Sequence, residues 1–150
     1  MKNREYERKF LFKEYPYIIS EFKHYKIKQW YLTKPEDSVS IRIRLYNDNR
    51  CYMDFKKGKG VDRFEYGVKC NFTDVEPLTE NMTFIEKDRY SLRTDEYLLI
   101  IDEYNNGLKL VEIECDDLNY IKNFKPFDWM GEEVTDKIEY TNHWLAFNLK

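Results

Sequence analysis

The chain begins with charged residues two positions apart, in the stretch Glu5-Tyr6-Glu7-Arg8-Lys9. Successive side chains of a β-strand point to opposite faces, so in a strand Glu5, Glu7 and Lys9 would share one face. Two like charges on that face lie roughly 7 Å apart and repel by roughly 2 kcal/mol at an effective dielectric of about 20. Water and salt would screen this repulsion, whereas an enclosed site requires cations beside the carboxylates.

Three further segments repeat the spacing and the likeness of charge. They are Arg42 and Arg44, Lys87 and Arg89, and Glu112 and Glu114. Any single pair is ordinarily the solvated face of a strand, because an antiparallel sheet commonly exposes one face to water. Inside an enclosed site, two acidic and two basic pairs would require cations beside the carboxylates and anions beside the lysine and arginine side chains.

The composition limits the classes of protein that remain. At 150 residues and 42% hydrophobic content the chain fits a single domain, 1–150, with a sizeable core. The net charge of -3 argues against a protein that coats nucleic acid. Three cysteines without Cys-x-x-Cys spacing indicate neither a disulfide framework nor a zinc site. No apolar run is long enough for a bilayer, so we expect a cytoplasmic protein with no membrane or nucleic-acid partner.

Alternating polarity predicts about eight strands, with short turn clusters such as Asn105-Asn106-Gly107 joining antiparallel neighbours. The predicted strands cover 4–12, 25–33, 39–47, 50–57, 62–70, 84–91, 96–104 and 108–115. Helical periodicity is left for 14–23, 73–82, 117–123 and 135–147, the last with Asp136 and Glu139 as a capping pair and Ile138 facing the core. The segment 129–135 is predicted to be a packing turn.

The two faces of the predicted strands differ in chemistry. Ile41, Ile43 and Leu45 oppose Arg42 and Arg44. Helices could cover the apolar face from outside, and the charged face would line the interior if the sheet closed. The residues by themselves allow an α+β fold with a closed eight-stranded antiparallel β-barrel, or tunnel, and helices packed on the outside. An open curved sheet with a solvated charged face is the alternative.

The charge pairs, in this order, resemble the CYTH superfamily, the triphosphate tunnel metalloenzymes, over essentially the whole chain. Further segments in the family's order are Gln29-Trp30-Tyr31-Leu32, Asp54-Phe55-Lys56, Arg63-Phe64-Glu65-Tyr66, Ile85-Glu86-Lys87-Asp88-Arg89-Tyr90, Leu110-Val111-Glu112-Ile113-Glu114 and a closing segment over 129–135. Two positions depart from the pattern. Gly67 stands where many members have the second glutamate of a Glu-x-Glu pair, and Trp30 stands where members often have glycine.

The resemblance implies a tunnel that binds a small-molecule triphosphate through basic side chains and one or two Mg²⁺ or Mn²⁺ ions through acidic ones. Carried over by position, the phosphate ligands are Lys9, Arg42, Arg44, Lys56, Lys87 and Arg89. The metal ligands are Glu5, Glu7, Glu112, Glu114 and Asp102. Catalytic roles fall to Lys9, Arg44, Lys87 and Glu65. The oligomeric state is left open, a homodimer included.

The chemistry of these residue types agrees with that implication. Arg and Lys offer fork-like and point-charge partners to phosphates, and carboxylate oxygens suit Mg²⁺ or Mn²⁺. We expect metal-dependent hydrolysis of inorganic tripolyphosphate, because no residues mark a dedicated base pocket. The alternatives are a class IV-type adenylate cyclase, which makes cyclic AMP and pyrophosphate, and a thiamine triphosphatase. A barrel that binds polyphosphate or single-stranded nucleic acid without turnover is the non-enzymatic alternative.

Overall fold

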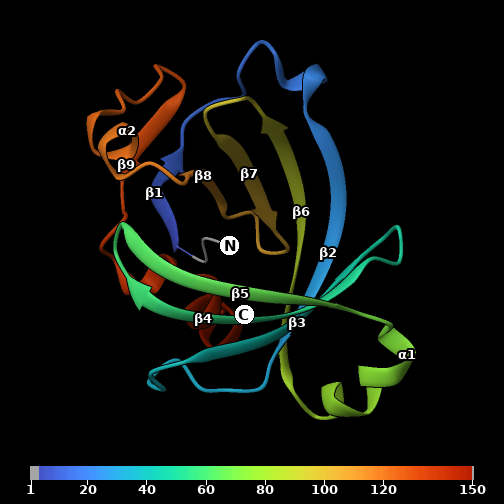
Figure 1. Cartoon of the computed structure of the whole chain (residues 1–150). Coiled ribbons are helices and arrows are strands. Elements are labelled where there is room, and N and C mark those ends of the chain that lie inside the picture. Colours follow the sequence, from blue (N-terminus) through green and yellow to red (C-terminus); the bar gives the residue numbers. More distant parts are fainter. Residues whose placement is uncertain (1–3, 150) are drawn as a thin grey trace.

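The structure, a computed structural model, describes residues 4–149, which form one antiparallel sheet closed into a barrel (Figure 1). The strands are β1 (Arg4–Phe12), β2 (Lys23–Tyr31), β3 (Ser40–Tyr46), β4 (Cys51–Lys59), β5 (Asp62–Cys70), β6 (Thr83–Arg93), β7 (Leu98–Tyr104), β8 (Lys109–Cys115) and β9 (Met130–Glu133). Their order is β5-β4-β3-β2-β6-β7-β8-β1-β9, and pairing of β5 with β1 closes the ring of the first eight. The predicted closed eight-stranded barrel is confirmed.

The ring closes on β1, whose two edges are paired differently. One edge pairs with β8 from Tyr6 to Leu11, whereas the other pairs with β5 only from Arg4 to Tyr6. Beyond that point the second edge needs partners for its backbone N–H and C=O groups. Strand β9 supplies them at Phe10 and Phe12. The predicted packing turn over 129–135 is therefore wrong, because this segment completes the open edge of β1 as a ninth strand.

The outer faces of β1, β7 and β8 carry the main apolar core. Its buried members include Phe10, Leu99, Ile101, Val111 and Ile113, packed against Ile121 and Met130. Ile121 belongs to α2 (Leu118–Asn123), and the carboxylate of Asp117 accepts a hydrogen bond from the backbone N–H of Tyr120 at the start of that helix. The predicted helix over 117–123 is confirmed, and it covers the barrel from outside.

The opposite outer wall is covered by α1 (Phe72–Val75), which the 3-10 helix η2 (Glu76–Thr79) follows directly in the chain. Trp30 points outward here and stacks on Phe72, with ring centroids 5.4 Å apart. The position that departs from the family pattern thus serves packing outside the barrel. The predicted helix over 73–82 is two short pieces, because Pro77 has no N–H to donate to the preceding turn.

Two other helix predictions fail in part. Within 14–23 only Ile19–Glu21 forms a 3-10 turn (η1), since Pro16 restricts the backbone before it and β2 already begins at Lys23. The segment 135–147 divides into the 3-10 helix η3 (Ile138–Tyr140) and α3 (Asn142–Asn148). Thr141, in place of the predicted pair Asp136 and Glu139, caps α3 by accepting a hydrogen bond from Trp144. Ile138 is 59% exposed and does not face the core.

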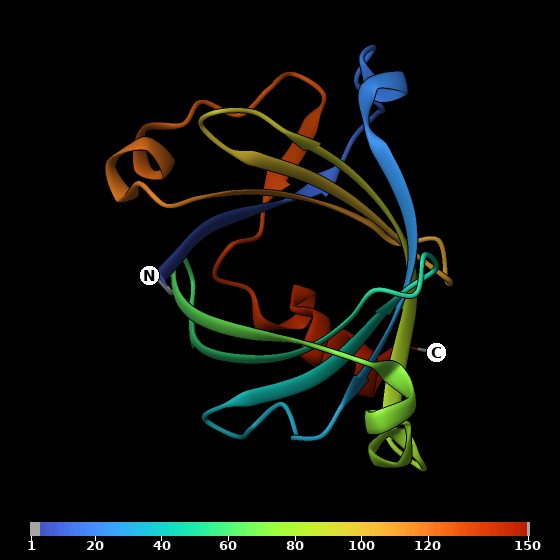
Figure 2. The ribbon, with the colours of Figure 1, turned by 45° about the vertical axis from the view of Figure 1, so that its right-hand side comes forward.

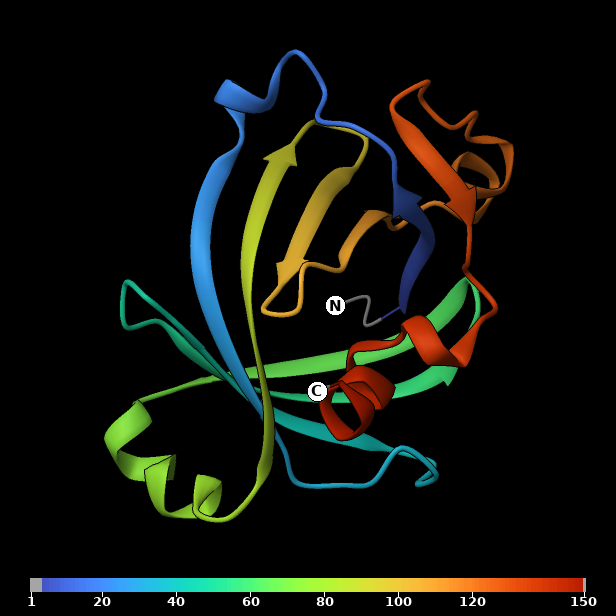
Figure 3. The same cartoon turned by 180° about the vertical axis from the view of Figure 1, so that it is seen from behind.

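Helix α3 lies at one end of the barrel (Figures 2 and 3). Its Leu145 and Ala146 pack against side chains that point into the barrel. These are Tyr31, Ile85, Tyr104 and Leu110. The helix therefore narrows one end of the interior. Among residues 4–149, no helix has the length and apolar character that crossing a membrane requires.

Candidate active site

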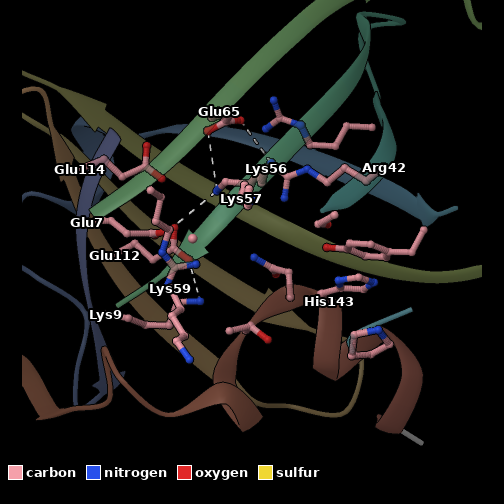
Figure 4. A pocket seen from close by; sticks show the side chains of 18 of the residues that line it. Glu7, Lys9, Arg42, Lys56, Lys57, Lys59, Glu65, Glu112, Glu114 and His143 are labelled. Atoms are coloured by element: carbon pink, nitrogen blue, oxygen red, sulfur yellow. Dashed lines mark ion pairs between the residues drawn. The ribbon is translucent and has the colours of Figure 1, made fainter. Parts of the chain in front are cut away.

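A cavity of about 710 Å³ occupies the barrel interior (Figure 4). Its charged lining includes Glu7, Lys9, Arg42, Arg44, Lys56, Arg63, Glu65, Arg89, Glu112 and Glu114. Five predicted phosphate ligands are in this set, namely Lys9, Arg42, Arg44, Lys56 and Arg89. The sixth, Lys87, has a side chain that is 0% exposed and does not line the cavity. The alternating faces of the strands thus converge on one polar interior.

Strands β3 and β4 form a first basic wall around the carboxylate of Asp54. Asp54 is 2% exposed, and its Oδ2 accepts hydrogen bonds from Nε of Arg42 (3.1 Å) and Nε of Arg44 (2.6 Å). The other nitrogens of Arg44 point elsewhere, with Nη1 donating to the hydroxyl of Tyr46 at 3.1 Å. One buried carboxylate therefore offsets the repulsion between two arginines on the same face.

Strands β6 and β7 form a second basic wall around Asp102. Its Oδ1 accepts from Nε of Arg89 (2.8 Å), and its Oδ2 lies 2.8 Å from Nη2 of Arg89 and 2.9 Å from Nζ of Lys87. Burial by itself would raise the pKa of Asp102, but Arg89 and Lys87 lower it below its usual value. Burial, together with the charge of Arg89, lowers the pKa of Lys87 to about 7. Both oxygens of Asp102, a predicted metal ligand, are occupied by these cations.

Three carboxylates gather where β1 meets β8. Glu5, Glu7 and Glu114 each place an oxygen within 4.8 Å of the others. Oε1 of Glu5 is buried and has no hydrogen-bond donor among the described residues. Burial, with the charge of Glu114, raises the pKa of Glu5 to about 10, and burial, with the charges of Glu112 and Glu7, raises the pKa of Glu114 to about 7. We call these three residues the acidic cluster.

Two basic side chains approach the acidic cluster from β4 and β5. Nζ of Lys56 lies 3.7 Å from Glu5 and 3.9 Å from Glu7, and also 3.6 Å from Glu65 (Figure 4). Nε of Arg63 lies 2.7 Å from Glu7. Burial by itself would raise the pKa of Glu65, but Lys56 and Arg42 lower it well below its usual value. The charges of Lys56 and Arg42 therefore favour the ionised form of Glu65, whereas burial favours the protonated form of its neighbour Glu5.

Glu112, the fourth predicted glutamate ligand, is held apart from the acidic cluster by Lys9. Its Oε1 lies 3.0 Å from Nζ of Lys9, which follows from their opposite positions on the paired strands β1 and β8. Although burial disfavours its charged form, Lys9 and Arg89 lower the pKa of Glu112 well below its usual value. Lys9 Nζ also donates to the backbone carbonyl of Tyr140 at 2.8 Å.

Three contributors to the site lie outside the predicted set. Arg63 has no like-charged neighbour two residues away, although its shared face with Glu65 is a signal that could have placed it inside. Asp54 shares a face with Lys56 in the same way. Asn142 accepts hydrogen bonds from Lys87 (3.0 Å) and from the hydroxyl of Tyr104. It comes from the C-terminal segment, and no periodicity in the sequence predicts that contact.

The donor set of the acidic cluster fits a hard divalent cation. Mg²⁺ and Mn²⁺ prefer carboxylate oxygens, and three such oxygens already lie close together. A cation here would also stabilise the ionised forms of Glu5 and Glu114, whose raised pKa values show that nearby protein cations do not suffice.

Comparisons with known proteins place the chain near two curated enzymes. It is 35% identical over 152 residues to an inorganic triphosphatase of Nitrosomonas europaea, covering 97% of this chain and 98% of the relative. It is 33% identical over 128 residues to an inorganic triphosphatase of Acetivibrio thermocellus, covering 81% and 80%. A crystal structure of an inorganic triphosphatase superposes with a TM-score of 0.67 at 33% identity, covering 97% of this chain and 95% of the other. No protein-family model matches the chain.

Proposed function

This chain belongs to the inorganic triphosphatase family, and we propose that it hydrolyses inorganic tripolyphosphate with the help of a divalent metal ion. We also place it, with that family, in the CYTH superfamily of triphosphate tunnel metalloenzymes. The observation that carries the proposal is one cavity in which basic side chains from β1, β3, β4 and β6 face Glu7 and Glu114 of the acidic cluster.

The basic side chains suit a linear polyanion. Asp54 fixes Arg42 and Arg44 through their Nε atoms and leaves their Nη atoms unengaged by that carboxylate. Nη1 of Arg44 donates to Tyr46 and Nη2 of Arg42 lies 3.6 Å from Glu65, so Nη2 of Arg44 and Nη1 of Arg42 are the further donors for phosphate oxygens. On the second wall Asp102 holds Arg89 through both Nε and Nη2, which leaves Nη1 of Arg89 for a phosphate oxygen. Lys9 and Lys56 add point charges from the neighbouring strands. Phosphoryl transfer depends mainly on positioning and charge neutralisation, both of which these residues supply.

The acidic cluster would hold Mg²⁺ or Mn²⁺ through Glu5, Glu7 and Glu114. Bound there, such an ion neutralises phosphate charge and lowers the pKa of a bound water. Glu65 is ionised beside Lys56, and we assign it the role of accepting a hydrogen bond from the attacking water. Lys9 and Arg44 would bind the phosphates through the reaction, and Lys87 would act from behind the cavity wall. Glu112 and Asp102 stay predicted ligands, although each is paired with basic side chains.

The test is to incubate purified protein with tripolyphosphate and Mg²⁺ or Mn²⁺, and to resolve orthophosphate and pyrophosphate over time. We expect metal-dependent release of both, a large loss in Arg44→Ala, and full activity in Lys23→Ala, which removes an exposed lysine of β2. Cyclic AMP and pyrophosphate from ATP would support the cyclase alternative instead. Thiamine diphosphate and orthophosphate from thiamine triphosphate, without turnover of tripolyphosphate, would support the thiamine triphosphatase. Binding without any product would support a binding barrel.

The place of action follows from the cysteines. Cys51, Cys70 and Cys115 are free thiols, which fits a reducing compartment. We therefore place the activity in the cytoplasm.

A further inference from the structure

Gly67 of β5 lies directly opposite Asp54 of β4 in the paired strands. A Cβ atom built on Gly67 would lie 2.8 Å from Oδ1 of Asp54, closer than real Cβ contacts come. Apart from the chain neighbours of Gly67, only Asp54 among residues 4–149 places atoms within 4 Å of that position. The missing side chain therefore leaves a space that the Asp54 carboxylate fills, and nothing else competes for it.

The carboxylate of Asp54, which fills that space, accepts hydrogen bonds from both arginines of β3. It is 2% exposed and accepts from Nε of Arg42 at 3.1 Å and Nε of Arg44 at 2.6 Å. Using Nε leaves the Nη edge of each guanidinium for other partners, which are Glu65 for Arg42 (3.6 Å) and the Tyr46 hydroxyl for Arg44. Without Asp54, two cations on one strand face would repel each other and lose their fixed orientation.

We propose that Asp54 and Gly67 form a positioning pair for the phosphate-binding arginines: the absence of a side chain at 67 admits Asp54, and Asp54 orients Arg42 and Arg44 toward the cavity. Neither residue of the pair needs to touch the substrate. The assignment rests on the proposed triphosphatase function, because the arginines are oriented for phosphate.

If the pair acts in this way, a carboxylate supplied from β5 should replace the carboxylate of Asp54 on β4. Gly67→Glu alone should clash with Asp54 and lower stability. Asp54→Ala alone should free the arginines and raise KM for tripolyphosphate about tenfold, with a smaller change in kcat. The double variant Asp54→Ala/Gly67→Glu should place a carboxylate in the vacated space from β5. We expect its KM to return to within about threefold of the parent value.

The experiment measures KM, kcat and the urea midpoint for the parent, both single variants and the double variant. Asp54→Asn keeps the side-chain shape and serves if Asp54→Ala does not fold; it should raise KM in the same direction. Asp88→Ala is the matched control, because Asp88 pairs with His24 and Lys26 on the outside of the barrel and should leave KM unchanged.

Different measurements test the triphosphatase function and the positioning role of Asp54 and Gly67. The urea midpoints need no activity, so a parent protein without turnover would reject the triphosphatase proposal while the stability coupling between positions 54 and 67 is still measured. A double variant no more stable than the single variants would overturn the pairing. A KM in Asp54→Ala and Asp54→Asn equal to the parent, or a double variant no better than Asp54→Ala, would overturn the positioning role.

Discussion

The basic walls and the acidic cluster solve the same electrostatic problem in different ways. On the walls, each pair of like charges has its own buried counter-charge, Asp54 for β3 and Asp102 for β6. In the acidic cluster, Lys56 stands 3.7 Å and 3.9 Å from Glu5 and Glu7, and the pKa of Glu5 still rises to about 10. Each wall therefore has its own counter-charge, whereas the three carboxylates of the cluster share two cations, Lys56 and Arg63.

Because of that difference, the protein and the surrounding solution supply different parts of the site. Because Asp54 and Asp102 already offset the repulsion on the walls, the basic side chains can be folded and oriented before a polyanion arrives, so little reorganisation accompanies binding. The cluster, by contrast, binds protons when no metal is present, and a metal must displace them. We infer that the protein fixes the phosphate ligands and leaves the last cation to be supplied by the solvent.

The largest effect is expected from removing the counter-charge of the second wall. Asp102→Ala would leave Lys87 and Arg89 buried without a carboxylate, and breaking such a group typically costs about 3–5 kcal/mol. Urea unfolding without metal or phosphate measures this loss in the free energy of unfolding. Glu86→Ala is the control, because its pair with Lys28 is solvent-exposed and should contribute less than about 1 kcal/mol. Equal losses in the two variants would contradict the contrast between wall and surface.

The acidic cluster should make the folded protein less stable as the pH rises. Glu114 has its pKa raised from 4.5 to about 7, so the folded state holds a proton that the unfolded state releases. Its contribution is fully present below pH 4.5 and is lost as pH rises through about 7. Between about pH 5.5 and pH 8 in EDTA, the parent should lose on the order of 2 kcal/mol relative to Glu114→Gln. Parallel pH profiles for the two proteins would show that Glu114 does not titrate in this range.

The sequence predicts some features of the walls and the acidic cluster and not others. The period of two places Arg42, Lys56 and Glu112 on an inward face and so predicts the charged interior. It does not state which strands meet, so the pairing of Lys9 with Glu112 and the isolation of the acidic cluster need the register of β1 and β8. Strand register depends on closure of the whole ring, so a local sequence pattern does not predict it.

The C-terminal segment shows the same limit more sharply. Its helical pattern over 135–147 is visible, but its position in the barrel end is not, because α3 packs on inward-facing side chains far away in the sequence. The contacts of Tyr140 with Lys9 and of Asn142 with Lys87 follow from that position. Lys87 matches the phosphate-binding pattern in the sequence. In the structure it donates to Asn142 and lies behind the cavity wall.

Metal binding gives the next effect in size. Glu7→Gln removes one carboxylate ligand while keeping the side-chain shape, and should raise the metal concentration for half-maximal turnover at least about tenfold, or about 1.4 kcal/mol. A titration of Mn²⁺ at saturating tripolyphosphate measures it. Glu80→Gln, at an exposed position outside the barrel, should behave like the parent. Full activity of Glu7→Gln at limiting metal would remove Glu7 from the proposed ligands.

The smallest effect should come from changing the kind of cation on the first wall while keeping its charge. Arg44 uses Nε to contact Asp54 and Nη1 to contact Tyr46, which leaves Nη2 as a further donor. Lysine has one ammonium group and cannot hold Asp54 while presenting a fixed fork to phosphate. Arg44→Lys should therefore raise KM for tripolyphosphate about fivefold, or about 1 kcal/mol, with little change in the urea midpoint. An unchanged KM would mean that the wall supplies charge alone, and that the orientation imposed by Asp54 has no part in binding.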